Sequence, residues 1–280
     1  MLEAVAAGGH AGHSAAVLSI DGVLYVCESI GGSTGERNGV IRTPYDEWMA
    51  AASKTRWLVT LVRLNEEAYA KWDQAAAETW FKSVEGSPYG YANYLFGWLD
   101  SIDGNYFKPF TKETLLSLMF IVDTVAPDVS VKMWGRALNK RLGTDGLTLP
   151  EILAKTETAG AQTIYELMAV PEQDDWVYSD GVAMVCDVFT AALFKHGGVL
   201  DVDFQATEIT PAFLYGLNIY ESDGSKRPAQ CQAADPDVPY CQLTGELKHG
   251  LLGYNTMAPY DNMFETCSGG APTYKYTPGC

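Results

Sequence analysis

The chain is poor in basic residues and in long apolar segments. Lys and Arg number 19 of 280 residues against 35 Asp and Glu, which gives a formal net charge of −16 at pH 7. Clustered basic side chains are what bind nucleic acids and anionic membranes, so this balance argues against either as a partner. The longest apolar run near a predicted helix, residues 115–122, is far too short to span a bilayer. We therefore expect no nucleic-acid partner and no transmembrane segment.

Several short motifs are missing as well. There is no N-x-S/T sequon, no C-x₂-C pair and no internal repeat. The opening MLEAVAAGGH has no charged n-region and no long apolar core, so it is not predicted to be a signal peptide. Charged residues make up only 19% of the chain and apolar residues 47%, which excludes a disordered protein. The length suits one large domain, or one domain with elaborations.

The six cysteines are unevenly distributed. Four of them lie in the last 50 residues, a stretch rich in Pro and Gly: Cys231, Cys241, Cys267 and Cys280. Such a tail is typical of two disulfides that close loops around little core, and it implies an oxidising compartment. Of the three possible pairings we favour the sequential one, Cys231–Cys241 and Cys267–Cys280, because it closes the shortest loops. The alternatives are four free thiols or, less favoured without a C-x₂-C pair, a zinc site.

Apolar periodicity and turn residues predict a hairpin, a further strand and a helical middle. The predicted elements are a hairpin at 14–29 turning at Asp21-Gly22, a strand at 57–64, a helix at 66–83, helices at 111–142 broken at Pro127, one or two helices at 149–169, and an apolar helix at 181–196 stopped by Gly197-Gly198. Because strands and helices do not alternate, this pattern indicates an α+β fold. We predict one domain over residues 1–220, with a helical insertion at about 105–175, and a loop-like Cys- and Pro-rich tail over 221–280 packed on it.

His13 and Glu28 are the first candidate functional pair. With the hairpin turning at Asp21-Gly22, the two residues fall opposite or diagonal to each other near the open end of the strands. A carboxylate beside an imidazole orients the ring and raises its basicity. The spacing alone also fits an incidental pair of surface residues.

Cys186 is the candidate nucleophile, near the start of the apolar helix in the segment SDGVAMVCDVF. A helix N-terminus lowers the pKa of a thiol and supplies backbone N–H groups for an oxyanion. A buried structural thiol is the competing interpretation, since free cysteine is among the most buried residue types. Asp187 directly after it is unusual for a purely apolar stretch. A Cys27–Cys186 disulfide is a further alternative and would exclude the catalytic interpretation. Strand alternation predicts instead that the Cys27 side chain faces the core.

The chain has only four histidines. His10 and His13 have a spacing that could suggest a metal site, but a Gly-rich loop rarely presets ligand geometry and no third ligand is evident. We predict no metal and no cofactor, and interpret His10 as a loop residue. His196 ends a predicted helix, where the dipole favours the imidazolium form. No motif around His249 predicts a role for it.

Two segments together resemble the motifs of a known family. GHSAAVLSIDGVLYVCES, in which a Gly-His opens a strand and a polar residue ends the next one, resembles the first motif of circularly permuted papain-fold thiol hydrolases of the NlpC superfamily. MVCDVFTAALFKHGG resembles the nucleophile helix of that family. The order His, acid, Cys is the permuted order. The whole pattern, with its Cys-rich tail, is similar to an uncharacterised group of secreted or vesicular eukaryotic members. The helical stretch from about 105 to 175 is longer here than in compact bacterial members, and many relatives carry His where this chain has Glu28.

The resemblance implies a papain-like fold with permuted topology, in which a small antiparallel sheet packs on the nucleophile helix. It implies a thiol hydrolase or cysteine peptidase with Cys186 as nucleophile, His13 as base and Glu28 as the residue that orients His13, forming a thioester acyl-enzyme. Tyr89 and Tyr91, in SPYGY, are candidate substrate-binding residues, with loop packing as their alternative role.

The expected substrate is a small peptide, a muropeptide or a lipid-like acyl compound. The expected location is secreted or in a lysosomal or vesicular lumen, with the leader removed. The alternatives are a catalytically inactive secreted binding or structural protein on the same fold, or a lipid acyltransferase. The oligomeric state and the choice between hydrolysis and transfer stay open.

Overall fold

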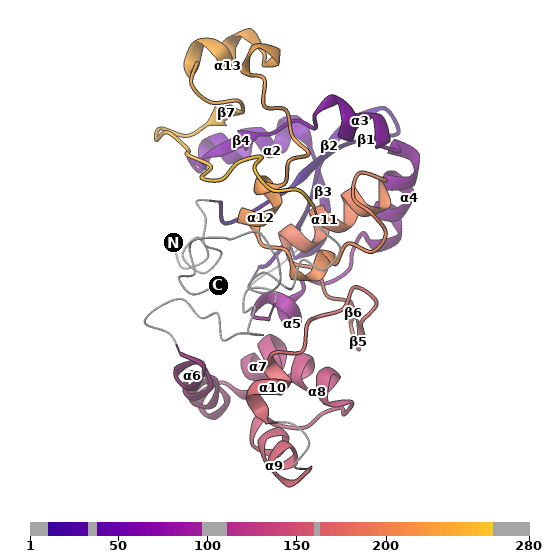
Figure 1. The fold of residues 1–280 in the computed structure, drawn as a ribbon, viewed down its shortest axis with the longest axis vertical. Helices are drawn as coiled ribbons and strands as arrows, with labels where there is room; N and C mark the ends of the chain where they lie inside the picture. Colours follow the sequence, from indigo (N-terminus) through magenta and orange to yellow (C-terminus); the bar gives the residue numbers. More distant parts are fainter. Residues whose placement is uncertain (1–10, 33–37, 97–110, 160–162, 260–280) are drawn as a thin grey trace.

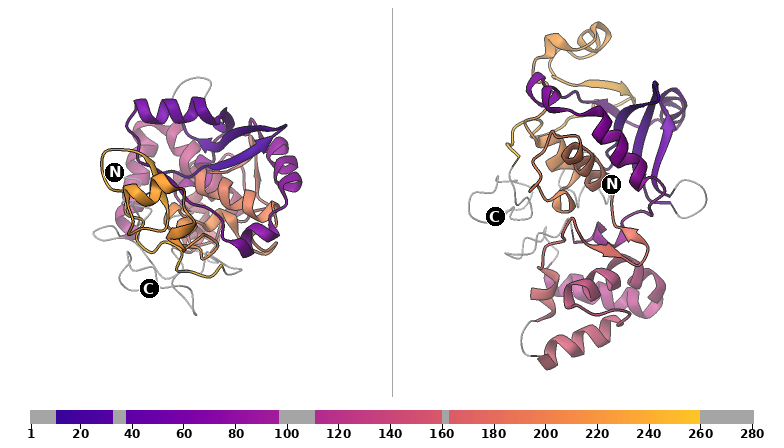
Figure 2. Two further views of the ribbon diagram at one scale, coloured as in Figure 1. Left: turned by 90° about the horizontal axis from the view of Figure 1, so that it is seen from above. Right: turned by 90° about the vertical axis from the view of Figure 1, so that its right-hand side faces the viewer.

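The computed structural model describes residues 11–32, 38–96, 111–159 and 163–259. The described residues form two lobes (Figure 1). The sheet lobe contains the three-stranded sheet and the helix that begins at Cys186, and the helical lobe contains residues 112–168, against which the short strands at 177–182 pack. The right-hand view of Figure 2 shows the helical lobe at the opposite end of the molecule from the three-stranded sheet. The structure is thus mixed α+β with a small antiparallel sheet, as predicted.

The elements follow one another in a simple order. The sheet lobe begins with β1 (Ala16–Ile20), β2 (Val23–Ile30), β3 (Gly39–Pro44), α2 (Tyr45–Lys54), β4 (Val59–Leu61), α3 (Glu66–Lys71) and α4 (Gln74–Val84). The short α5 (Tyr91–Tyr94) follows and packs on the helical lobe. The helical lobe comprises α6 (Lys112–Val125), α7 (Pro127–Ser130), the π-helical η1 (Val131–Gly135), α8 (Arg136–Leu142), α9 (Leu149–Ala159) and α10 (Ile164–Met168). The chain then returns through β5 (Val177–Tyr178), β6 (Gly181–Val182), α11 (Cys186–His196), η2 (Ala206–Glu208), α12 (Pro211–Gly216), η3 (Gly224–Lys226), α13 (Ala229–Ala234) and β7 (Cys241–Thr244).

The predicted hairpin is confirmed, with β2 at the centre of the order β1-β2-β3. Asp21 and Gly22 occupy the turn with φ values of 52° and 80°. Gly and Asp tolerate this left-handed conformation, and two such residues in sequence give the turn whose twist matches the paired strands. The register places Ala16 opposite Cys27. Cys27 is fully buried, which confirms that it faces the core.

Helix α11 is the element around which the sheet lobe packs. The sheet and α4 cover one part of it, and residues 199–220 cover another. Of its eleven residues, seven are buried. The prediction that this helix begins at 181 is wrong. Gly181 has a φ of 116° and pairs with Tyr178 in the β5–β6 ribbon, so the chain becomes helical only at Cys186.

Other boundaries differ from the predictions for local reasons. The predicted helix at 66–83 is two helices, because the Asp73 carboxylate accepts from the backbone N–H groups of Ala75 and Ala76 and starts α4. The predicted strand at 57–64 is reduced to β4. The break at Pro127 is confirmed, since Pro127 is the first residue of α7. Residues 149–169 form two helices, the second starting at a Thr163–Glu166 capping box.

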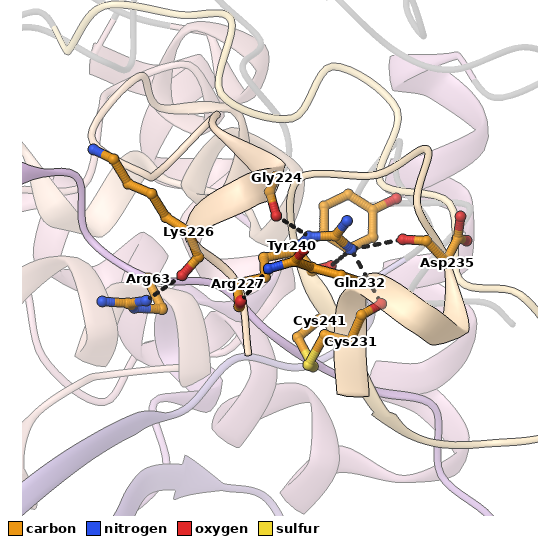
Figure 3. The surroundings of a disulfide bond; sticks show 9 residues. All are labelled: Arg63, Gly224, Lys226, Arg227, Cys231, Gln232, Asp235, Tyr240 and Cys241. Atoms are coloured by element: carbon orange, nitrogen blue, oxygen red, sulfur yellow. Dashed lines mark hydrogen bonds between the residues drawn. A yellow bond between two sulfur atoms is a disulfide. The ribbon is translucent and has the colours of Figure 1, made fainter. Parts of the chain in front are cut away.

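The segment after residue 221 is joined to the sheet lobe by a strand, and a disulfide closes a loop within the segment itself. β7 pairs antiparallel with β4. The predicted Cys231–Cys241 disulfide is present, with the two Cα atoms 5.3 Å apart, while Cys267 and Cys280 lie outside the described residues. Figure 3 shows the buried Arg227 beside this disulfide, where its guanidinium donates to the carbonyl oxygens of Gly224, Asp235 and Tyr240 among others. Across the described ranges, no helix has both the length and the apolar character needed to cross a bilayer.

Candidate active site

Glu28 and His13 are in direct contact. The His13 Nε2 atom donates to Glu28 Oε2 at 2.8 Å. Glu28, in the central strand β2, is 1% exposed, and its other oxygen accepts from Trp48 Nε1 at 3.0 Å. Trp48 lies on α2 and is itself buried. The carboxylate is therefore held from two sides, which fixes the direction in which it presents an oxygen to the imidazole.

Cys186 also acts on the imidazole. Among the groups that raise the pKa of His13, the Cys186 thiol comes first, ahead of Glu28. Because Nε2 contacts Glu28, Nδ1 is the ring nitrogen available to the thiol. Desolvation acts to lower the pKa of His13, but the hydrogen bonds and charges of Cys186 and Glu28 outweigh it and raise that pKa to about 10. The ring is thus predisposed to carry a proton between a thiol and a carboxylate.

The start of α11 positions Cys186. Val185 is the N-cap in an extended conformation, and Cys186 is the first helical residue. The first N–H groups of a helix have no acceptor within the helix, so they point outward at this end. The hydroxyl of Thr190, one turn later, donates to the Cys186 carbonyl at 2.9 Å. Its oxygen also lies 3.3 Å from Ser14 Oγ, which connects the residue after His13 to α11.

Asp187 is buried directly behind the thiol. It is 1% exposed, and the Cys186 S–H donates to its Oδ1 across 3.8 Å. Burial raises the pKa of Asp187 to about 7, against the opposing effects of nearby backbone N–H groups, the His13 charge and the Cys186 thiol. The sequence marks Asp187 only as an unusual residue in an apolar stretch. Trp48 carries no sequence signal, because the helix that holds it was not predicted.

Tyr89 and Tyr91 lie on a loop that reaches the strand leading into Cys186. Tyr89 forms a β-bridge with Met184, and the N–H of Gly90 donates to the Met184 carbonyl at 3.0 Å. A Cβ at Gly90 would lie 2.2 Å from the Met184 nitrogen, so only glycine allows this approach. Lys132 Nζ lies over the Tyr91 ring, 4.0 Å from its centroid, in a cation–π contact. Both tyrosines are half-buried, and the loop joins the two lobes close to the thiol.

The remaining cysteine and histidines occupy other places. Cys27 and Cys186 are both free thiols, so no disulfide links them. His10 lies outside the described residues. His249 Nδ1 is 2.8 Å from Thr60 Oγ1 and belongs to the β4 region. His196 stacks on Trp80, and burial followed by the Lys195 charge lowers its pKa, contrary to the expectation of a helix-favoured imidazolium.

No metal-binding cluster of three or more His, Cys, Asp or Glu side chains is found in the parts of the chain that the structure describes. A small hollow beside Arg227 is lined by residues that include none of His13, Glu28 and Cys186. The arrangement at Cys186 therefore combines a thiol, an imidazole, a carboxylate and a helix N-terminus. Groups of these kinds are able to support nucleophilic acyl transfer.

The chain was compared with known proteins at three levels. It matches no protein-family model, no curated protein and no solved structure.

Proposed function

We propose that the protein is a cysteine-dependent hydrolase that cleaves an amide or peptide bond, or an ester, at Cys186. The observation that supports this most strongly is the Glu28–His13 hydrogen bond next to Cys186, because the Cys186 thiol raises the pKa of His13 and Cys186 is the first residue of a buried helix. A papain-like, circularly permuted fold is part of the proposal. His13 and Glu28 come from an antiparallel hairpin that precedes the cysteine helix in the chain, which is the permuted order.

The first chemical step forms a thioester. The Cys186 sulfur, as thiolate, attacks the acyl carbon, and the carbonyl electron pair moves to oxygen. His13, holding the proton taken from the thiol, gives that proton to the leaving amine or alcohol as the C–N or C–O bond breaks. Glu28 keeps the ring in the orientation that presents Nδ1 to sulfur. The N–H of Cys186, at the helix start, is placed to bind the developing oxyanion.

The second step consumes water. His13 takes a proton from water, hydroxide adds to the thioester carbon, and the C–S bond breaks to release a carboxylic acid. The thiolate–imidazolium pair is regenerated when His13 retains that proton. An alcohol or amine in place of water would make the same residues an acyltransferase, so the site geometry supports both acceptors and the solvent favours hydrolysis.

The substrate is proposed to lie along the loop that carries Tyr89 and Tyr91, since this loop pairs with the residues just before Cys186. The proposed substrate is a small peptide, a muropeptide or a lipid-like acyl compound, which Tyr89 and Tyr91 would contact. The Cys231–Cys241 disulfide is compatible with an oxidising compartment, and we propose a secreted or lysosomal or vesicular location.

The test is an activity profile against panels of peptides, muropeptides, esters and phospholipids. Wild-type protein is expected to hydrolyse members of one panel, and Cys186→Ala is expected to lose that activity. Mass spectrometry should detect an acyl group on Cys186 during turnover. Cys27→Ala is the matched control, because it removes the other free thiol, which lies in the core, and should keep activity. Turnover that survives Cys186→Ala would contradict the proposal, as would complete inactivity with an unreactive Cys186, the result expected of an inactive binding protein.

Lipid acyl transfer is the second candidate, and one observation favours it. The helical lobe exposes an apolar row on α6 at Leu118, Ile121 and Val125, with exposed fractions of 42%, 57% and 74%. Val129 and Val131, which follow on α7 and η1, are also exposed. An apolar row of this kind is typical of a surface that meets lipid or another protein. Transfer of an acyl chain from a vesicle phospholipid to an added amine, abolished in Cys186→Ala, would select this candidate.

A further inference from the structure

One oxygen of the buried Asp187 carboxyl has no hydrogen-bond partner among the described residues. Asp187 is 1% exposed, and this oxygen is Oδ2. Its other oxygen faces the Cys186 sulfur at 3.8 Å. Buried polar atoms are nearly always satisfied, so an unsatisfied carboxyl oxygen beside a candidate nucleophile indicates a role in the chemistry.

Backbone N–H groups and two titratable side chains act on this carboxyl. The N–H groups are those of Asp187 and Val188, and the side chains are Cys186, on α11 itself, and His13, ahead of β1. Glu28 contacts His13 itself, through the Nε2 atom of the ring. Burial raises the pKa of Asp187 to about 7, so both protonation states are populated near neutrality. The neutral state suits the unpartnered Oδ2, because a protonated carboxyl is much cheaper to bury than a carboxylate.

We propose that Asp187 is a positioning residue whose neutral carboxyl donates a hydrogen bond to the Cys186 thiolate. Ionisation of Asp187 converts that thiolate to an unreactive thiol. This inference rests on the proposed function, since it concerns the reactivity of the same thiol. In the neutral state, the carboxyl O–H and the His13 imidazolium stabilise the thiolate from two sides. When Asp187 loses its proton to solvent, its negative charge repels the thiolate. The proton on His13 then returns to sulfur, leaving a thiol that donates to the Asp187 carboxylate and a neutral imidazole.

The consequence is an unusual direction of pH dependence. An ordinary thiol becomes more reactive as pH rises, because its thiolate fraction grows. Cys186 is instead expected to lose reactivity as pH rises through about 7, the pKa of Asp187. A thiol hydrolase regulated in this way is active in an acidic lumen and inactive at neutral to alkaline pH.

The experiment measures the rate at which iodoacetamide alkylates Cys186, read by peptide mass spectrometry between about pH 5 and pH 9. Wild-type protein should react at least about tenfold more slowly at the alkaline end. Asp187→Asn keeps a donor at every pH, so its rate should stay high through neutrality. Asp145→Asn, which alters an exposed carboxylate in the helical lobe, should follow the wild type. A flat wild-type profile, or the same alkaline fall in Asp187→Asn, would overturn the inference.

Two further comparisons separate this inference from the proposed function. If Cys186 reacts no faster than glutathione at about pH 6 and His13→Ala changes nothing, the proposed function fails and the inference fails with it. If labelling is fast and depends on His13 but does not change with pH, only the role of Asp187 is overturned. Asp187→Ser provides a smaller neutral donor for use if the Asn variant does not fold, and it should likewise lack the alkaline fall.

Discussion

Replacing Glu28 by Gln should reverse the tautomer of His13. Gln has nearly the shape of Glu, but one of its oxygens becomes an NH₂ group. Trp48 Nε1 can only donate, so the Gln oxygen must take its place at 3.0 Å from that atom. The NH₂ group then faces His13 Nε2, which must accept instead of donating. The ring proton moves to Nδ1, the nitrogen that faces Cys186, and His13 can no longer take the proton of the thiol.

The size of the effect follows from this tautomer change. The same exchange of a triad carboxylate for an amide lowers kcat about 10⁴-fold in a serine protease, and we expect a loss of similar order here. The loss of the Glu28 charge should also lower the pKa of His13 from about 10.

Two measurements check this prediction. The first is the activity, or the Cys186 alkylation rate, of Glu28→Gln beside Glu85→Gln, which alters a partly exposed carboxylate paired with Arg42 and should change the rate less than about twofold. The second is the ¹⁵N chemical shifts of His13, which report the protonated nitrogen. A Glu28→Gln variant that keeps more than about a tenth of the wild-type rate, with its proton still on Nε2, would refute the tautomer argument.

Three further predictions concern stability. Trp48→Phe removes the donor to a buried carboxylate oxygen of Glu28, so the free energy of unfolding measured by denaturant titration should fall by about 1–3 kcal/mol. Trp57→Phe, at a more exposed ring, is the control and should lower it less. Replacing Cys231 and Cys241 by Ser opens a short loop and should cost about 3 kcal/mol, and a protein whose unfolding is unchanged by reductant would contradict this. Asp187 has a pKa of about 7 in the folded state against 3.8 unfolded, so its contribution to the free energy of unfolding is lost as pH rises between these values. Asp187→Asn should remove this pH dependence and raise the free energy of unfolding by up to about 4 kcal/mol at pH 8. Parallel curves of stability against pH for wild type and variant would count against a raised pKa.

The contact between His13 and Glu28 was predictable because a local signal determines it. Asp21-Gly22 specifies a two-residue turn, and the turn sets the register of every pair in the hairpin. The burial of Cys27 follows from the same register. The Cys231–Cys241 pairing was also accessible, since it closes a short loop.

Other features depend on contacts that local patterns do not encode. Trp48 was missed because α2 begins after Pro44 without a side-chain cap. The start of α11 was misplaced because residues 181–185 are apolar enough to continue a helix, and only the ribbon pairing of Gly181 prevents it. The partner of β7 is β4, almost two hundred residues earlier, and no short-range pattern predicts such a pairing.

The central claim is that Cys186 is held as a thiolate by His13. Thiolates absorb in the ultraviolet where thiols do not, so the absorbance difference between wild type and Cys186→Ser counts the thiolate directly. Cys27 does not interfere, because burial raises its pKa to about 12. The account predicts close to one thiolate per chain at about pH 6, lost in His13→Ala. Equal absorbance of wild type and Cys186→Ser at that pH would contradict it.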